Sequence, residues 1–353
     1  MIFEYGLVEQ RVEKTRDDII KVLSMGEKRA LYLLNVLFDL ESVKKKAERE
    51  REHYLVIIDD IADSFDYKNK YAIIEYINEL TQEEYIDTLI LTHNFDFYRT
   101  VCTRINIPRN NSFIIQKDNN NKLIMSSFQY RKDIFKREVV DGIGNGQINT
   151  SKKKKWLIAG IPFIRNLAEY EKRTDIYNRL TQILHIKEDT YIISILEIWN
   201  YYIEIIQAEE LRMENRTIPA INLLKILAKE IYEMQVESIA LEDKIILSMA
   251  IRLMAEEFMI SKFHELNIIV PNSSSNQTRE WSNELMPYFT PEESYLLGQV
   301  NLITPENIHI NAFMYEPIID ISDWQLKDLY RNIKDLHPDD VADISIETTV
   351  NQA

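Results

Sequence analysis

The N-terminal third of the chain alternates between helix-type and strand-type hydrophobic patterns. Apolar residues recur at helical spacing over 27–50, and the aliphatic run that follows predicts a strand at 54–59 that is buried on both faces. A second helical pattern covers 68–80, and a second aliphatic run covers 85–93. This order predicts an α/β region, which a hairpin at 112–128 closes.

Beyond a glycine-rich stretch, the hydrophobic pattern becomes mainly helical. Residues 141–155 hold 3 of the 7 glycines and no apolar period, so they predict a linker between an N-terminal domain, 1–140, and a helical domain, 156–345. Ser322 to Gln325 fits a capping box at a helix start. Helices are predicted at about 156–172, 174–185, 189–209, 219–235, 240–264 and 322–336.

Composition narrows the class of protein. The 353 residues carry a net charge of -15, which argues against a surface dedicated to nucleic-acid phosphates. The single cysteine, Cys102, excludes an internal disulfide and favours a reducing compartment. No apolar stretch approaches the roughly 20 residues that cross a bilayer, and no signal peptide is evident. We therefore expect a cytoplasmic protein without a membrane partner.

Two adjacent acids end the first predicted strand. Asp59 and Asp60 follow the aliphatic run "LVII", at the edge where parallel α/β sheets bind ligands. Neighbouring carboxylates repel each other, so the pair is either a solvated strand end or is neutralised by a cation such as nucleotide-bound Mg²⁺. His93 follows the second strand, which places it at the same edge; a lone histidine there can also be structural.

The residues at the start of the first predicted helix could bind a phosphate. In "LSMGEKRA", Ser24 supplies a hydroxyl and Gly26 allows close backbone approach, while the helix N-terminus offers N–H groups to a phosphate. The alternative is a plain N-cap.

The order of these motifs resembles the heads of ABC-type ATPases, in the branch that includes SMC-like, RecF-like and phage-defence ATPases. The resemblance covers about residues 20–105 and matches the signature motif, Walker B, D-loop and H-loop. It implies an α/β ABC-type ATPase lobe, a partial P-loop NTPase fold, followed by a mainly α-helical domain. The matching residues are Ser24, Gly26 and Glu27, then Asp59 and Asp60, then Asp66, then His93. Ile61 stands where proline is common in that branch.

The resemblance implies a role for each residue. Asp59 would hold Mg²⁺, and Asp60 would act as general base toward the attacking water, although many ABC ATPases carry the longer glutamate there. His93 would contact the γ-phosphate of ATP, and Asp66 would organise the dimer interface. The signature residues Ser24, Gly26 and Glu27 would bind the nucleotide held by the opposite head, so that ATP joins two heads.

One expected motif is missing from the sequence. A phosphate-binding loop follows the pattern G-x-x-x-x-G-K-[ST], and none of the 7 glycines begins such a run. The expected partner is therefore a second ATPase head, either another copy or an N-terminal half that bears Walker A. ATP turnover is expected only when that missing lobe is supplied.

The helical half holds a second candidate constellation. Arg165 and Glu169 lie four apart on one predicted helix, and His185 lies on the next. Arg, Glu and His in this order resemble the catalytic set proposed for anticodon nucleases that follow an ABC-type head, which implies metal-independent RNA cleavage. The structural alternative is an i,i+4 ion pair beside a partly buried histidine.

The sequence leaves three hypotheses for function. The first is the C-terminal portion of an ATPase that dimerises on ATP and gates an effector protein in anti-phage defence. The second is an RNase whose helical domain cleaves RNA under control of the head. The third is an inactive remnant.

Overall fold

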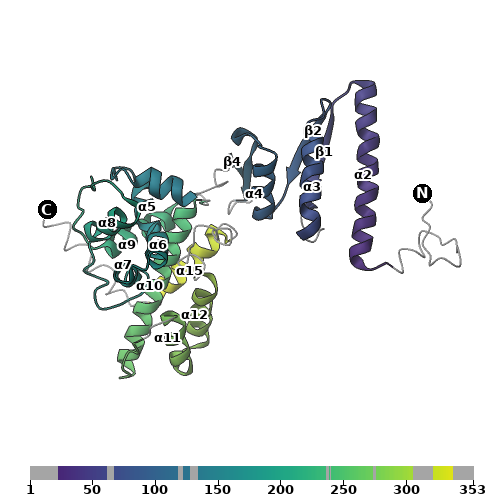
Figure 1. The fold of residues 1–353 in the computed structure, drawn as a ribbon. Coiled ribbons are helices and arrows are strands. Elements are labelled where there is room, and N and C mark those ends of the chain that lie inside the picture. Colours follow the sequence, from purple (N-terminus) through teal and green to yellow (C-terminus); the bar gives the residue numbers. More distant parts are fainter. Residues whose placement is uncertain are drawn as a thin grey trace. The chain divides into compact units, whose positions relative to one another are not determined.

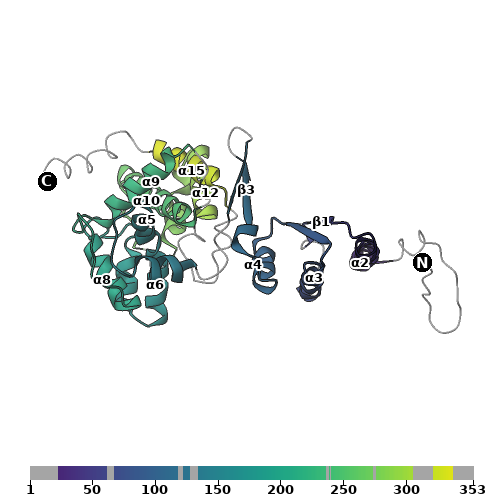
Figure 2. The ribbon, with the colours of Figure 1, turned by 90° about the horizontal axis from the view of Figure 1, so that it is seen from above.

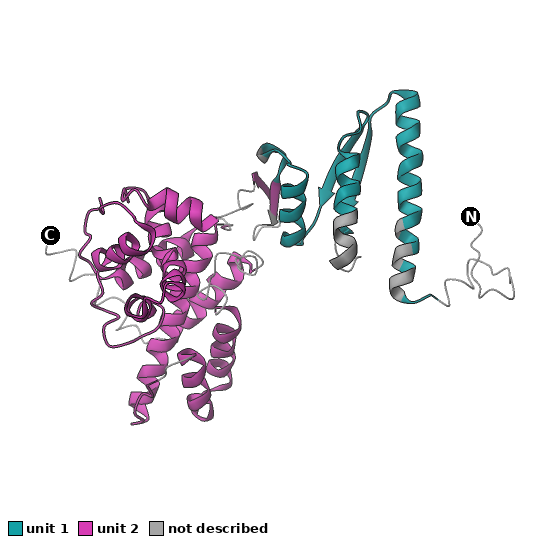
Figure 3. Cartoon of the chain, in the orientation of Figure 1, with its two compact units in different colours: residues 1–112 teal, residues 113–353 magenta. Residues whose placement is uncertain are grey.

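The computed structural model divides the chain into two compact units, 1–112 and 113–353 (Figures 1 and 3). It describes residues 23–61, 67–117, 122–127, 134–235, 238, 240–272, 276–304 and 321–336. Asp66 and residues 118–121 of the expected hairpin lie outside the described residues. Each unit is described by itself.

Unit 1 has the alternating order that its hydrophobic pattern predicts. Its elements are α2 (Met25–Glu50), β1 (Tyr54–Asp59), α3 (Tyr67–Leu80), β2 (Ile86–Leu91), α4 (Phe95–Arg104) and the short η2 (Arg109–Asn111). The two strands pair in parallel, from Tyr54 beside Ile86 to Asp59 beside Leu91. A parallel pair needs a crossover connection, and α3 supplies it.

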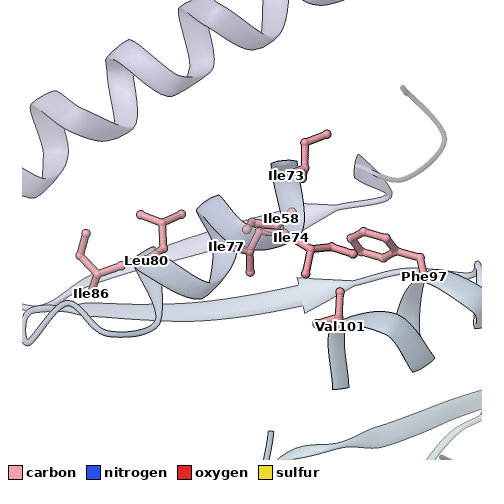
Figure 4. Packing of buried hydrophobic residues seen from close by; sticks show 8 residues of the cluster. All are labelled: Ile58, Ile73, Ile74, Ile77, Leu80, Ile86, Phe97 and Val101. Atoms are coloured by element: carbon pink, nitrogen blue, oxygen red, sulfur yellow. The ribbon is translucent and has the colours of Figure 1, made fainter. Parts of the chain in front are cut away.

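The core of unit 1 lies on one face of the strand pair. Ile58 of β1 and Ile86 of β2 pack with Ile74 and Ile77 of α3 and with Phe97 of α4 (Figure 4). Figure 2 shows α2, α3 and α4 on the same side of the strands.

The prediction that β1 is buried on both faces is wrong. Its residues alternate, with Leu55, Ile57 and Asp59 exposed and the residues between them at least partly buried. The aliphatic run concealed this alternation, because both faces of the strand carry the same kind of side chain. No helix among the described residues of unit 1 covers the outer face.

Unit 2 begins with an antiparallel hairpin and continues as helices. The hairpin pairs β3 (Phe113–Lys117) with β4 (Leu123–Ser127). The long α10 lies at the centre, in contact with α5, α9, α11, α12 and α15 (Figure 1). The helices are η3 (Lys136–Ile143, a π-helix), α5 (Ser151–Ala159), α6 (Ile161–Tyr170), α7 (Thr174–Thr181), α8 (Ile195–Ile206), α9 (Ala220–Glu233), α10 (Leu241–Glu265), α11 (Gln277–Leu285), η4 (Met286–Tyr288), α12 (Pro291–Ile303) and α15 (Asp323–Asp335).

Most predicted helices of this unit are present, with two differences. The helix expected over 156–172 is two helices, α5 and α6, which meet at Gly160, and Pro162 lies in the first turn of the second. Helices α11 and α12 were missed. The capping box at Ser322 and Gln325 is confirmed at the start of α15.

The stretch predicted as a linker contains ordered secondary structure. Residues 136–143 form the π-helix η3, and α5 begins at Ser151. Between them, Gly146 has a φ of 71°, and a Cβ there would lie 2.0 Å from the carbonyl oxygen of Glu210. This glycine lets the segment pack against the chain near Glu210, where Arg212 N–H donates to the Gly146 carbonyl at 2.8 Å. Gly146 therefore allows two backbone segments to lie close together.

Candidate active site at the carboxyl edge of the β1–β2 sheet

Asp59, Asp60 and His93 lie at one edge of unit 1. Because β1 and β2 are parallel, their carboxyl ends meet there, with Asp59 beside Leu91. Asp60 leaves β1 with a positive φ of 45°, while its N–H still donates to the Leu91 carbonyl at 3.0 Å. The backbone turn after β1 is thus tied to the end of β2.

Asp60 and His93 are in direct contact. Oδ1 of Asp60 accepts a hydrogen bond from the His93 backbone N–H at 3.0 Å and lies 2.9 Å from Nδ1 of the same residue. The two residues come from consecutive strands, 33 positions apart in sequence. The structure therefore brings together the expected general base and the expected γ-phosphate contact.

Hydrogen bonding sets the ionisation of Asp60. The His93 backbone N–H, and then the His93 ring, lower the pKa of the Asp60 carboxyl below its usual range, against a small opposing effect of burial. The side chains of Asp60 and His93 remain 42% and 68% exposed. The pair is therefore an ionised carboxylate and an imidazole that solvent and ligands can reach.

The loop after β2 holds His93 in place. Asn94 caps α4, and its side-chain oxygen accepts from the Phe97 N–H at 2.9 Å. The Asn94 N–H in turn donates to the Thr92 hydroxyl at 3.1 Å. His93 thus sits between two residues whose positions the strand end and the helix cap determine.

The predicted signature residues lie at the start of α2. Ser24 is exposed and directly precedes the helix, and its carbonyl accepts the Lys28 N–H at 2.9 Å. Gly26 and Glu27 belong to the first turn of α2, and their side chains lie outside the described part of the structure.

The chemistry of Asp59 fits a cation that a nucleotide carries. Its exposed carboxylate offers hard oxygen donors beside the Asp60–His93 pair. Mg²⁺ at phosphate sites takes one or two carboxylates, and water and phosphate oxygens complete its shell. Among the described residues, no group of three or more His, Cys, Asp or Glu side chains has the geometry to hold a metal ion.

The structure places the predicted nuclease residues of unit 2 in different environments. Arg165 and His185 are buried, whereas Glu169 is exposed. Arg165 lies 5.0 Å from the centre of the Tyr177 ring. Burial lowers the pKa of its guanidinium, and electrostatic interactions with Tyr177 and Glu169 act in the opposite direction. RNA cleavage by this set remains a prediction.

The buried partner of His185 is Glu256, which the sequence analysis missed. Nδ1 of His185 lies 2.7 Å from Oε1 of Glu256, and the Ile186 N–H donates to Oε2 at 2.7 Å. Gln277 and Thr278 also donate to this carboxylate, at 2.8 and 2.5 Å. Because Glu256 is 71 positions from His185, no local sequence pattern could have revealed the pair.

One family model matches the N-terminal part of the chain. Residues 7–138 match a family model described as AAA domain, which indicates an ATPase-like, P-loop-type α/β region. No helix among the described residues is long and apolar enough to cross a membrane.

The relatives that match are longer proteins without an established activity. One is the "Uncharacterized chromosomal cassette SCCmec type IVc protein CR006" of Staphylococcus aureus strain MRSA252, 25% identical over 118 residues. A Staphylococcus aureus protein with the same name matches equally. The match covers 33% of this chain and 17% of the relative. No solved structure matches the chain.

Proposed function

We propose that residues 20–105 are the part of an ABC-type ATPase head that manages the cation and the attacking water in ATP hydrolysis. The observation that carries this proposal is the direct contact of Asp60 with His93 at the carboxyl edge of two parallel strands. Ligands of open α/β sheets bind at this edge. The AAA-domain match over residues 7–138 supports the same class of activity.

In this proposal Asp60 acts as the general base. Its lowered pKa keeps the carboxylate ionised at neutral pH, so it can accept a hydrogen bond from water and then the proton. Asp59 would hold Mg²⁺, which supplies charge stabilisation for the phosphoryl group when bound.

In this proposal His93 contacts both the base and the nucleotide. If Nδ1–H donates to Asp60, Nε2–H can donate to a γ-phosphate only when the ring is doubly protonated. One residue would thereby connect the position of the base to the presence of the phosphate.

The complete head needs a phosphate-binding loop that this sequence does not contain. We place that loop on a complementary lobe and expect ATP to join two heads, with Ser24 contacting the nucleotide of the opposite head. The helical unit would attach or sense an effector. Defence against phage is the setting that the resemblance implies.

The decisive variant is Asp60→Asn, tested in the assembly that contains this chain. The chain is tagged at its C-terminus, produced from its own locus and purified together with its native partners. Loss of the base should slow ATP hydrolysis by about 100-fold or more and should trap the ATP-bound dimer. Measurement is by phosphate release and by light scattering.

Asp87→Asn is the matched control. Asp87 also pairs with a histidine, His53, at 3.2 Å, but it is the second residue of β2 and lies at the opposite end of the strand pair. Its replacement should leave turnover within about twofold of the original. Undiminished turnover by Asp60→Asn would remove Asp60 as the base.

A further inference from the structure

One arginine of unit 2 is fully buried and forms no ion pair with any described acid. Arg252, in the middle of α10, is 0% exposed. Its Nη1 donates to the Thr304 hydroxyl at 3.3 Å, and its Nε has no hydrogen-bond partner among the described residues. A guanidinium stays charged at neutral pH, and a buried charge is costly unless it is paired. Arg252 therefore has donors and a charge that the described part of the chain does not satisfy.

The acid that could pair with Arg252 on its own helix is engaged elsewhere. Glu256 follows four positions later on α10, at a spacing that often gives an ion pair. Its oxygens instead contact the His185 ring, the Ile186 N–H and the Gln277 side chain. The charge of Glu256 raises the pKa of Arg252, but burial lowers that pKa by more. Glu256 thus compensates Arg252 only in part.

A second buried arginine adds positive charge to this part of unit 2. Arg165 of α6 is 4% exposed, and its guanidinium carbon lies 5.0 Å from the centre of the Tyr177 ring. Burial chiefly lowers the pKa of Arg252 to about 10, and the charge of Arg165 contributes to that shift. The two guanidinium groups are therefore near enough to repel each other.

We infer that Arg252 and Arg165 bind the oxygens of a phosphate group inside unit 2. We call these two residues the arginine site. The inference does not rest on ATP hydrolysis by unit 1, and it adds a ligand to the helical unit. Binding breaks no bond, so the inference is also separate from the predicted RNA cleavage.

Two arginines favour a phosphate over a carboxylate. A guanidinium presents its N–H groups as a planar fork that matches two oxygens of one anion. One fork is enough for a carboxylate, whereas a phosphate has oxygens in several directions, so forks from two helices can bind it together. A phosphate group also carries about −1.5 to −2 charges at pH 7, which suits a place where two guanidinium groups repel each other.

Thr304 orients one of the two forks. Its hydroxyl donates to the Val300 carbonyl at 2.7 Å and accepts from Nη1 of Arg252. The hydroxyl has therefore used its hydrogen and is no donor to an anion. Its contact fixes one end of the Arg252 guanidinium and leaves Nε for the phosphate.

The test measures binding of inorganic phosphate to the full chain. Thermal unfolding is followed by tryptophan fluorescence, because the four tryptophans of the chain all lie in unit 2. The reference is a chloride buffer of the same pH and ionic strength. If the dissociation constant is about 0.1 mM, about 10 mM phosphate should raise Tm by about 5 °C or more. An unchanged Tm would overturn the inference.

The test variant is Arg252→Met, which removes the charge and keeps a long side chain. Calorimetry should show phosphate binding weakened by about 100-fold or more, and the gain in Tm should disappear. In chloride the variant should be at least as stable as the original, because an apolar side chain replaces an incompletely compensated buried charge. Phosphate also stabilises proteins in general by exclusion from their surface. An equal gain in Tm for the variant and the original would indicate that general effect and overturn the site.

Two further variants complete the comparison. Arg252→Lys keeps the charge but lacks the fork, so binding should weaken by about tenfold, and this variant decides the matter if Arg252→Met does not fold. Arg212→Met is the matched control. The Arg212 side chain is 60% exposed and pairs with Glu209 at 3.5 Å, so its loss should change phosphate binding less than about twofold.

Adenosine monophosphate distinguishes two sources of the phosphate group. It carries the same oxyanion as inorganic phosphate, attached to a nucleoside. Binding at least about tenfold tighter than that of phosphate, and lost in Arg252→Met, would identify a nucleotide as the ligand of the site. Tighter binding of inorganic phosphate would identify the free anion. Binding of either ligand that survives in Arg252→Met would overturn the arginine site.

Discussion

The Asp60–His93 pair of unit 1 and the His185–Glu256 pair of unit 2 have the same chemistry but differ in almost everything else. In unit 1, Asp60 and His93 are 42% and 68% exposed, and they lie at the open edge of a sheet. In unit 2, His185 and Glu256 are 8% and 0% exposed. Contact between these residue types therefore identifies neither a catalytic site nor a structural one. The distinction comes from what else surrounds the carboxylate.

In the buried pair, other groups of the protein donate hydrogen bonds to both oxygens of the carboxylate. Glu256 accepts from His185, the Ile186 N–H, Gln277 and Thr278, so it joins three separate parts of the chain. Burial alone would raise the pKa of Glu256, but hydrogen bonds from His185, Thr278 and the Ile186 N–H, with the electrostatic interaction with His185, outweigh it, and the pKa falls. A carboxylate held in this way has little capacity left for a substrate.

The largest effect is expected from Glu256→Ala. Removing the carboxylate leaves several buried donors without an acceptor and should lower the free energy of unfolding of unit 2 by about 3–5 kcal/mol. All four tryptophans lie in unit 2, so urea unfolding followed by tryptophan fluorescence reports on this unit alone.

Glu257→Ala is the control for that experiment. Its carboxylate pairs with Lys225 at 2.9 Å and is partly exposed, so a loss of about 1 kcal/mol is expected. The folded pKa of Glu256 is lowered, so its contribution to stability should persist above about pH 4.5 and fall below it. If both variants unfold at the same urea concentration, Glu256 is not the structural centre we describe.

A second buried acid, Glu242, differs from Glu256 because it lacks a comparable set of hydrogen-bond donors. Glu242, in the first turn of α10, is buried, and its Oε2 has no hydrogen-bond partner among the described residues. Burial, with a smaller effect from the charge of Asp243, raises the pKa of Glu242 from 4.5 to about 7. The folded protein therefore keeps this proton over a pH range where the unfolded chain has lost it.

Glu242→Gln should remove a pH dependence of stability. Because the folded pKa lies above the unfolded one, the free energy of unfolding should decrease as pH rises from about 5 to 7 and stay level above that. The variant should be more stable than the original by about 1–3 kcal/mol at pH 8 and similar at pH 5. Glu292→Gln, at an exposed position in α12, should show no such difference. Parallel pH profiles for all three proteins would contradict the assignment.

The smallest effect on stability is expected from Asp60→Asn. The side chain is exposed, so the free energy of opening of unit 1 should change by no more than about 0.5 kcal/mol. Amide hydrogen exchange of β1 and β2 measures that opening. A decrease in the free energy of opening of more than about 2 kcal/mol would show that the exposed pair stabilises the fold. The contrast drawn between the exposed and the buried pair would then be wrong.

Sequence pattern predicted the parts of this structure that depend on neighbours along the chain. The strand at 54–59 and the acids that end it follow from a local run, and His93 was placed at the same edge because parallel strands share an end. The capping box at Ser322 follows from four consecutive residues.

The remaining features depend on packing between distant segments. Glu256 meets His185 across 71 positions, and the open side of β1 depends on which helices are present to cover it. The break at Gly160 is also tertiary: a Cβ there would lie 2.6 Å from the Tyr202 hydroxyl, on a helix about forty residues away. Hydrophobic periodicity carries no information about such contacts.

The positive φ of Asp60 bears on which acid can occupy this position. At a φ of 45°, aspartate and asparagine are tolerated far better than residues with longer side chains. Glutamate, common at the matching place in the ATPases that this region resembles, would extend toward the water but strain the turn. Replacing aspartate by glutamate here would therefore lengthen the side chain at the cost of backbone strain. A related protein with glutamate at this position should also differ in the turn that follows the strand.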